Sequence, residues 1–299
     1  MRSARASLAG SRLSDPLHGH LAAPAGPRCR SPKGVFVVLR QRILSALVLI
    51  PIVVGLSCVG GPYFVVLVAL FGLLAGYEFY ELVLKSGQWP FKVAGLLLIA
   101  LFMLDAYMPA LGVLKPALAA AVMIPMVWQI LQIGMQGFLM AWALAITGAL
   151  YVGGLFSYLI SVRNLPQGLA WLLLTFAATW TCDSSAYLVG VNLGKHGFFT
   201  HISPRKTWEG AIGGLVGGAV ATMIAGRFVG LPWWLGLLLG WVLAVGITFG
   251  DLAESLVKRQ VGVKDSSHLI PGHGGMLDRI DSLMFAGVIV YYFVLWFWH

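Results

Sequence analysis

The sequence contains few cysteines and little charge. Its 299 residues include 3 cysteines, Cys29, Cys58 and Cys182, which are far apart and form no CxxC pair. That pattern gives no indication of a zinc site or a disulfide scaffold. Charged residues make up 10% of the chain against 59% hydrophobic residues, and the mean hydropathy is +0.86. These values argue against an ordinary soluble domain and are typical of a helical membrane protein.

Apolar runs of about 20 residues recur along the chain, a length that can cross the hydrocarbon core of a bilayer as a helix. The runs lack the alternation of a membrane barrel, and hydrocarbon offers no hydrogen bonds to the backbone, so each run must satisfy its own backbone groups as a helix. We therefore predict an all-α integral membrane protein, a polytopic helical bundle with about nine spans. They fall near residues 43–60, 62–84, 93–111, 116–133, 138–162, 168–190, 210–229, 231–250 and 282–298.

The net charge of +9 comes mainly from the amino-terminal region. Eight of the 20 Lys and Arg residues lie in residues 1–42 beside one acid, Asp15. The rest of the chain is nearly balanced, so we expect no nucleic-acid partner. Residues 1–34 are rich in Ser, Pro, Gly and Arg and contain no long apolar run, which predicts a disordered basic extension ahead of a transmembrane domain at residues 35–299. A start-site artefact, a genuine tail and an organelle transit peptide all fit this extension.

The basic residues of the loops predict how the chain is oriented across the membrane. If the amino terminus is cytoplasmic, nine Lys and Arg residues fall in inner loops and three in outer loops, which agrees with the positive-inside bias. Most acids also fall near the inner ends of the spans. The orientation places the polar segment of residues 255–282 in the cytoplasm.

Residues 255–282 carry four basic residues, three aspartates and two histidines between two hydrophobic spans. A segment this polar does not pack apolar surface, so we interpret it as a site for phosphates and a metal. Asp278 and Asp281 lie one helical turn apart, and two carboxylates at that spacing suit Mg²⁺. The alternative is that Asp281 only caps the last helix.

Two neighbouring segments extend this candidate site. Asp251, Glu254 and Lys258 would share one face if the span at 231–250 continued as a helix, although a solvated helix end is the alternative. The glycine-rich loop at residues 271–275 offers backbone N–H groups that could cradle phosphate, or it is an ordinary turn. It is not a Walker A loop, because no GK[ST] follows.

Upstream, Asp183 lies well inside a predicted span, where a carboxylate is costly and therefore a functional candidate. Residues 202–210, ISPRKTWEG, add two cations that suit phosphate oxygens. A basic stop at the membrane edge would explain Arg205 and Lys206 but not Ser203, Thr207 and Glu209. The following glycines at 210, 213, 214, 217 and 218 predict close packing of helices.

At these spacings, a dozen residues of the carboxyl-terminal polar segment resemble the signature of the phosphatidate cytidylyltransferase (CDP-diacylglycerol synthase) family. They are Ser255, Lys258, Arg259, Lys264, Asp265, Pro271, His273, Gly274, Gly275, Asp278, Arg279 and Asp281. The resemblance extends over about residues 35–299, including the Asp183 segment, ISPRKTWEG, the Arg40–Arg42 entry and the end of the span at Tyr77–Phe79. The chain departs from the family pattern at Val191, Gly197 and His201, where members usually carry basic residues.

The resemblance implies a multi-helix membrane enzyme, often dimeric, that converts CTP and phosphatidic acid to CDP-diacylglycerol and pyrophosphate with Mg²⁺. Residues 35–299 would then be a transmembrane cytidylyltransferase domain, expected in a bacterial plasma membrane. A homodimer and a second cation are left open. The implied catalytic and metal-site acids are Asp183, Asp251, Asp278 and Asp281. The implied substrate-binding residues are Ser203, Lys206, Thr207, Glu209, Ser255, Lys258, Arg259, Lys264, Asp265, His273, Gly274, Gly275 and Arg279.

Two other functions are compatible with parts of this sequence. A secondary transporter would also carry acids within its spans, but it predicts internal repeats and midplane charges that we do not find. A CTP-dependent lipid-alcohol kinase would share the nucleotide and the membrane but transfer the terminal phosphate. The position of a label on CTP distinguishes these alternatives.

Overall fold

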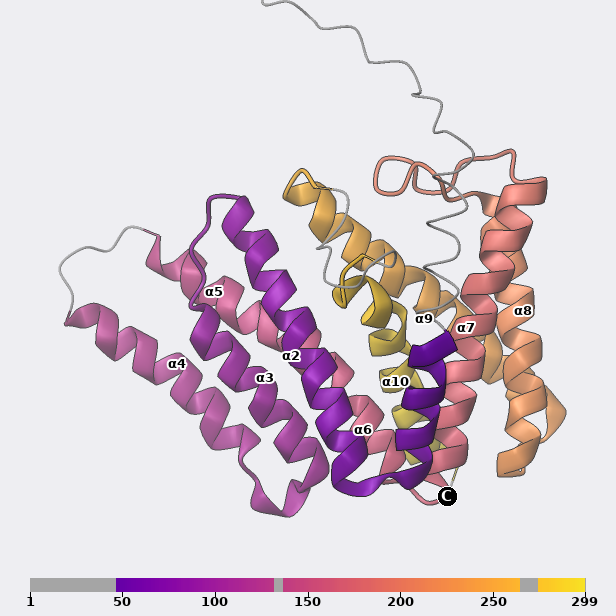
Figure 1. Ribbon diagram of the computed structural model, residues 1–299, viewed down its shortest axis with the longest axis horizontal. Helices are drawn as coiled ribbons and strands as arrows, with labels where there is room; N and C mark the ends of the chain where they lie inside the picture. The colour runs from indigo at the N-terminus through magenta and orange to yellow at the C-terminus, as the bar shows by residue number, and fades with distance from the viewer. Residues whose placement is uncertain (1–46, 132–136, 264–273, 299) are drawn as a thin grey trace, which may run out of the picture.

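A computed structural model describes residues 47–131, 137–263 and 274–298 of the chain. Lys264, Asp265 and His273, which the sequence predicts as substrate-binding residues, lie outside this part, as does the predicted extension at residues 1–34. The described residues fold into helices (Figure 1). After a first helix at Leu47–Val59, these are α2 (Gly61–Lys85), α3 (Lys92–Tyr107), α4 (Leu114–Ile130), α5 (Phe138–Gly148), α6 (Tyr158–Arg163), α7 (Gly168–Leu193), α8 (Trp208–Gly226), α9 (Trp233–Gln260) and α10 (Leu277–Phe297). A long connection at residues 194–207 joins α7 to α8.

The all-helical class predicted from the apolar runs is confirmed for the described residues. Five helical segments there are long and apolar enough to cross a membrane: α2, the segment Phe138–Arg163 that contains α5 and α6, the segment Trp208–Val229 that contains α8, α9 and α10. The helices at Leu47–Val59 and α4 are apolar but shorter. The number of nine spans therefore stays a prediction.

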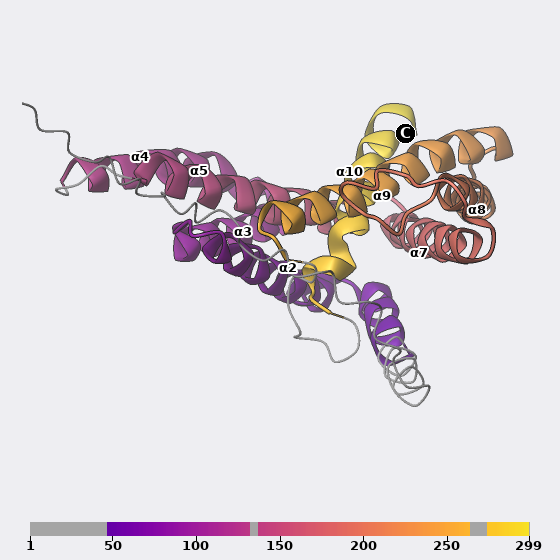
Figure 2. The same ribbon diagram turned by 90° about the horizontal axis from the view of Figure 1, so that it is seen from above.

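The helices form two groups with α10 between them. Figure 1 and the view from above in Figure 2 place α3, α4 and α5 toward one end and α7 and α8 toward the other. α10 contacts α2 and α6 as well as α7 and α9, so it links both groups. Its buried face includes Met284, Ala286 and Val290, all fully buried. The position of α10 therefore depends on both groups.

The predicted close packing of the α8 glycines is confirmed. A Cβ atom added at Gly214 would lie 3.0 Å from the Ala186 Cβ and 3.1 Å from the Cys182 carbonyl oxygen of α7. At Gly210 it would lie 2.9 Å from the Ala186 carbonyl oxygen. Larger side chains would force the two helices apart, so these glycines allow α7 and α8 to approach closely.

Two predicted helix ends differ from the structure, and both differences bear on the polar segment. α9 continues to Gln260, past the predicted end near residue 250, and α10 begins at Leu277 instead of residue 282. The extended end of α9 is not a solvated helix end, because Glu254 is only 1% exposed. Asp281 lies beyond the first turn of α10, so the alternative in which it only caps that helix is wrong. α10 can begin early because the Glu78 carboxylate accepts the backbone N–H groups of Met276 and Leu277, and near the end of α9 Lys258 pairs with Glu254 and Asp278.

A π-helical turn at Ala149–Gly154 joins α5 to α6, where the sequence predicts one uninterrupted span. The turn packs directly on α3, because a Cβ atom added at Gly153 would lie 2.8 Å from the Ile99 Cα atom. It also places the Tyr151 hydroxyl in a buried position without a hydrogen-bond partner among the described residues. π-Turns inside helices occur often near functional sites.

Candidate active site

A polar cavity of about 650 Å³ lies between α7, α9, α10 and the connection that leads into α8. Its charged and hydroxyl lining includes Asp183, Ser203, Arg205, Lys206, Thr207, Asp251, Glu254, Lys258, Asp278, Arg279 and Asp281. Residues from sequence positions about 100 apart therefore meet in one space. Ten of these eleven residues either belong to the predicted site or lie on the predicted polar face of α9. The eleventh, Arg205, is not among the predicted site residues.

Three acids of this cavity lie close enough to bind one cation. Asp251 and Glu254 are one turn apart on α9, Asp281 comes from α10, and one carboxylate oxygen of each lies within 4.8 Å of the others. A Cβ atom added at Gly250 would lie 2.8 Å from the carbonyl oxygen of Asp281, so glycine there lets the two helices approach. The close helix contact brings the three carboxylates together.

Glu254 shows how well these acids suit a cation. Its side chain is 1% exposed; Oε2 pairs with Lys258, whereas Oε1 is buried without a hydrogen-bond partner in the described part of the chain. A buried polar oxygen without a partner costs free energy, and hard divalent cations such as Mg²⁺ prefer oxygen ligands of this kind. The donor set and the buried oxygen therefore fit Mg²⁺.

Lys258 connects this acid cluster to Asp278. Its Nζ contacts the Glu254 carboxylate and donates to Asp278 Oδ1 at 2.6 Å. Asp278 Oδ2 also accepts the Gly275 backbone N–H at 3.0 Å. Asp278 thus lies beside the three-acid cluster and pairs with a lysine, while Asp183 lines the same cavity from α7. Their predicted roles as metal-site acids stay predictions.

The connection before α8 brings cations to the same cavity. Lys206 Nζ lies 2.8 Å from Asp251 Oδ2, which links this connection to α9. Thr207 caps α8, because its hydroxyl oxygen accepts the Gly210 N–H at 3.1 Å. That contact gives Thr207 a structural role, besides its place in the cavity lining.

Two residues predicted to bind substrate, Glu209 and Arg259, make structural contacts outside the cavity lining. Glu209 accepts the backbone N–H groups of Lys195 and His196 and pairs with the His196 ring at 2.6 Å. Arg259 donates from Nε to the Ile202 carbonyl oxygen at 3.0 Å. Both residues therefore hold the α7–α8 connection against the helices.

Ser255, Gly274 and Gly275 complete the set of predicted residues that the structure describes. The Ser255 hydroxyl lies 3.4 Å from Asp251 Oδ1, and the Gly275 N–H bonds to Asp278. Gly274 has φ +83°, and a Cβ atom there would lie 2.9 Å from Asp278 Oδ2. Glycine is needed at this position because other residues rarely adopt that backbone conformation.

Sequence reasoning missed two acids of this region. The sequence predicts Glu254 on the polar face of α9 but not among the metal-site acids, although its spacing from Asp251 indicates that the two share one face. Glu78 of α2 is 1% exposed and accepts the backbone N–H groups of Met276 at 2.9 Å and Leu277 at 2.8 Å. It thereby stabilises the start of α10, which carries Asp278 and Asp281. The sequence signals for Glu78 were an acid near the end of a predicted span and its place within the Tyr77–Phe79 part of the family resemblance.

The chain is similar to known proteins over most of its length. Residues 40–297 match the cytidylyltransferase family. The chain is 35% identical to a phosphatidate cytidylyltransferase of Bacillus subtilis over 267 residues, which cover 86% of this chain and 97% of that protein. It is 34% identical to a phosphatidate cytidylyltransferase of Synechocystis, with 85% of this chain and 96% of that protein covered. The chain therefore belongs to the phosphatidate cytidylyltransferase family.

Proposed function

We propose that the polar cavity is where this membrane phosphatidate cytidylyltransferase joins phosphatidate to CTP. An oxygen of the lipid phosphate attacks the α-phosphorus of CTP, and the bond from that phosphorus to the bridging oxygen of the β-phosphate breaks. The products are CDP-diacylglycerol and pyrophosphate. The observation that supports this location best is the convergence of the Asp251, Glu254 and Asp281 carboxylates with Lys206 and Lys258 in one cavity.

We infer that the chain's own residues act by position and charge. The attacking phosphate is already anionic, so no general base and no covalent enzyme intermediate are needed. The two substrates repel each other, and Lys206, Lys258 and Arg279 would offset that repulsion by binding phosphate oxygens. Asp278 would orient Lys258, to which it is hydrogen-bonded. Alignment of two bound reactants can supply a large part of the rate acceleration.

In this proposal Asp251, Glu254 and Asp281 hold Mg²⁺. The ion, when bound, would neutralise charge on the phosphate oxygens during the displacement. Asp183 and Asp278 line the cavity beside this cluster and are the remaining predicted metal-site acids. A carboxylate lost from the cluster would therefore weaken the response to Mg²⁺ as well as the rate.

The proposed setting is a bacterial plasma membrane, with the amino terminus and the cavity on the cytoplasmic side and about nine spans. The distribution of basic residues in the loops supports this orientation. The acyl chains of phosphatidate stay in the bilayer while CTP arrives from water, so catalysis belongs at the depth of the lipid headgroups. A homodimer is proposed on the family resemblance alone.

Membranes that contain the protein, incubated with phosphatidate, Mg²⁺ and labelled CTP, test the function. We expect label from α-labelled CTP to enter CDP-diacylglycerol and label from γ-labelled CTP to leave as pyrophosphate. Transfer of the γ-label to lipid would indicate a kinase, and transfer of neither label would favour a transporter. Both results contradict the proposal.

Asp281→Ala tests the acid cluster in the same assay. We expect the variant to form no detectable CDP-diacylglycerol at normal expression, because the remaining carboxylates hold the cation poorly. Asp105→Asn is a matched control, since Asp105 lies outside the cavity lining and accepts the Leu114 N–H at 3.2 Å. Near-normal turnover of Asp281→Ala across a Mg²⁺ titration would contradict the metal assignment.

A further inference from the structure

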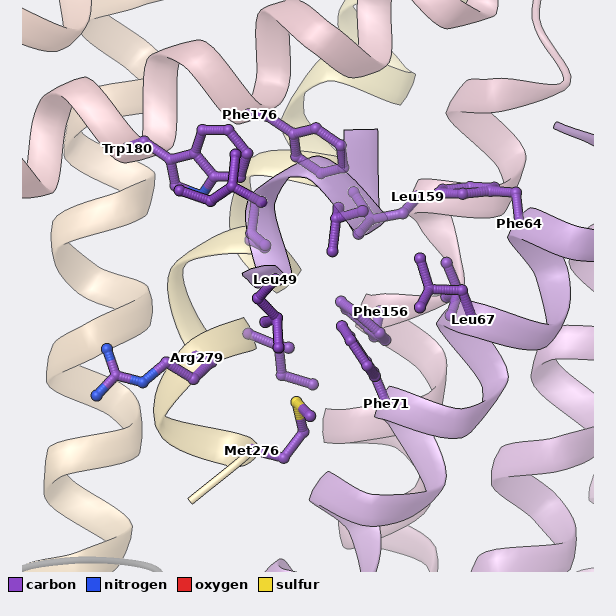
Figure 3. A pocket seen from close by; sticks show the side chains of 15 residues that line it. Leu49, Phe64, Leu67, Phe71, Phe156, Leu159, Phe176, Trp180, Met276 and Arg279 are labelled. Carbon is purple, nitrogen blue, oxygen red and sulfur yellow. The ribbon is translucent and has the colours of Figure 1, made fainter. Parts of the chain in front are cut away.

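A second cavity, of about 220 Å³, lies on another face of α10 and is almost entirely apolar (Figure 3). The helix Leu47–Val59, α2, α7 and α10 all contribute to its lining, as do Phe156 and Leu159. Aromatic and branched aliphatic side chains make up nearly all of that lining, and among the described residues Arg279 is the one charged member. A cavity with this composition suits a hydrocarbon ligand.

Arg279 also belongs to the polar cavity, so one side chain lines both spaces. Figure 3 shows its guanidinium group turned away from the apolar side chains, while its stem lies beside them. An arginine commonly buries its aliphatic stem against apolar surface and directs its charge toward a polar partner. Arg279 therefore lines both cavities, with its stem on the apolar side and its charged group directed away from that side.

The sequence of α10 explains why this helix separates the two cavities. Met276, Ile280 and Leu283 lie at helical spacing on the apolar side, and Asp278 and Asp281 lie on the polar side. The residues on each side are three or four positions apart, which places them on one face of a helix. α10 thus has an amphipathic first half inside the protein.

We propose that the apolar cavity holds an acyl chain of phosphatidate while Arg279 binds the phosphate of the same lipid. This inference rests on the proposed function, because that reaction brings an anionic phosphate with attached chains to the acid cluster. The phosphate needs a polar site, the chains need an apolar one, and a single molecule must reach both. The shared arginine supplies the charge complementarity that selects a phosphate-bearing lipid.

The cavity also borders the outer surface of the protein. Ile50 lines the cavity and is 42% exposed, so a chain entering from the bilayer would pass beside the helix Leu47–Val59. A chain that moves from lipid into this cavity exchanges one apolar environment for another, so it gains little hydrophobic free energy. The cavity would therefore act by placing the phosphate rather than by raising affinity.

Val53→Trp tests the proposal, because Val53 lines the cavity and is partly buried. The larger side chain should displace a long acyl chain and, through it, the phosphate. We expect the ratio of kcat/KM for dioleoyl- over dioctanoyl-phosphatidate to fall about tenfold, since a displacement of about 1 Å can cost 10²-fold in rate. Ile52→Trp is the matched control; Ile52 is 47% exposed and does not line the cavity. An unchanged ratio in Val53→Trp, or the same fall in Ile52→Trp, would overturn the proposal.

A labelling experiment on the wild-type protein needs no substitution and no turnover. Phosphatidate with a diazirine at the end of one acyl chain should label the segments 49–53 and 276–283, and unlabelled dioleoyl-phosphatidate should prevent the labelling. Label confined to outward residues such as Val66 and Leu70, or equal competition by dioleoyl-phosphatidylcholine, would refute the acyl site. If the wild-type protein transferred no label from α-labelled CTP to dioleoyl- or dioctanoyl-phosphatidate, the proposed function would fail instead. The diazirine labelling would still show whether an acyl chain enters the cavity.

Discussion

Replacing Glu78 by glutamine tests how α2 holds the end of α10 that lines the polar cavity. The Glu78 carboxylate is buried and accepts two backbone N–H groups, those of Met276 and Leu277, at 2.9 and 2.8 Å. The first N–H groups of a helix have no partner within the helix, and a negative charge near them is favourable. Glutamine preserves the shape of the side chain but replaces one acceptor oxygen by a donor.

The expected loss of stability follows from these two hydrogen bonds. A buried N–H group left without an acceptor costs about 1–3 kcal/mol, so Glu78→Gln should lower the free energy of unfolding by about that amount. Glu78→Ala removes both acceptors and should lower it by about 2–6 kcal/mol. Asp278 and Asp281 follow directly on α10, and a shift of about 1 Å in their position could lower kcat about 10²-fold.

Thermal unfolding in detergent and the α-labelled CTP assay measure both effects. Glu81→Gln is the control on the same helix, because Glu81 pairs with Lys92 at a position where its side chain is 37% exposed. Such a pair contributes about 0–1 kcal/mol, so we expect little change in stability or activity. Wild-type stability and kcat in Glu78→Gln would refute the idea that this carboxylate positions α10.

Two further substitutions test an ion pair in the cavity and the contact between α8 and α9. Lys258→Met should lower the free energy of unfolding by about 3–5 kcal/mol, because it removes the lysine that pairs with the buried Glu254 and Asp278 carboxylates. A change below about 1 kcal/mol in chemical denaturation would contradict the pairing. Gly240→Ala should lower the free energy of unfolding by about 1–3 kcal/mol, since its Cβ would lie 2.5 Å from a Cα atom of α8. Gly55→Ala is the control, because a Cβ there meets nothing within 4 Å and should not destabilise the protein. Equal melting temperatures for the two variants would argue against the close α8–α9 contact.

The sequence predicted the helical class and most of the charged residues that line the cavity. Apolar runs must form helices in hydrocarbon, so the class follows from composition and length alone. Helical spacing placed Asp251 and Glu254 on one face of α9, and the polar segment predicted that Asp278, Arg279 and Asp281 lie at a site. Local spacing was sufficient for these residues because neighbours on one helix share a face whatever the helix packs against.

Only the tertiary structure decided which acids meet. Spacing within α10 does not tell whether Asp278 or Asp281 faces Asp251. The close approach of α9 to α10 at Gly250 brings Asp281 to Asp251, whereas Asp278 pairs with Lys258. The start of α10 depends on a carboxylate 198 residues away from Met276 in the chain, so no local pattern could locate it. Contacts between helices distant in sequence set these positions, because each side chain takes the partner that the packed bundle brings within reach.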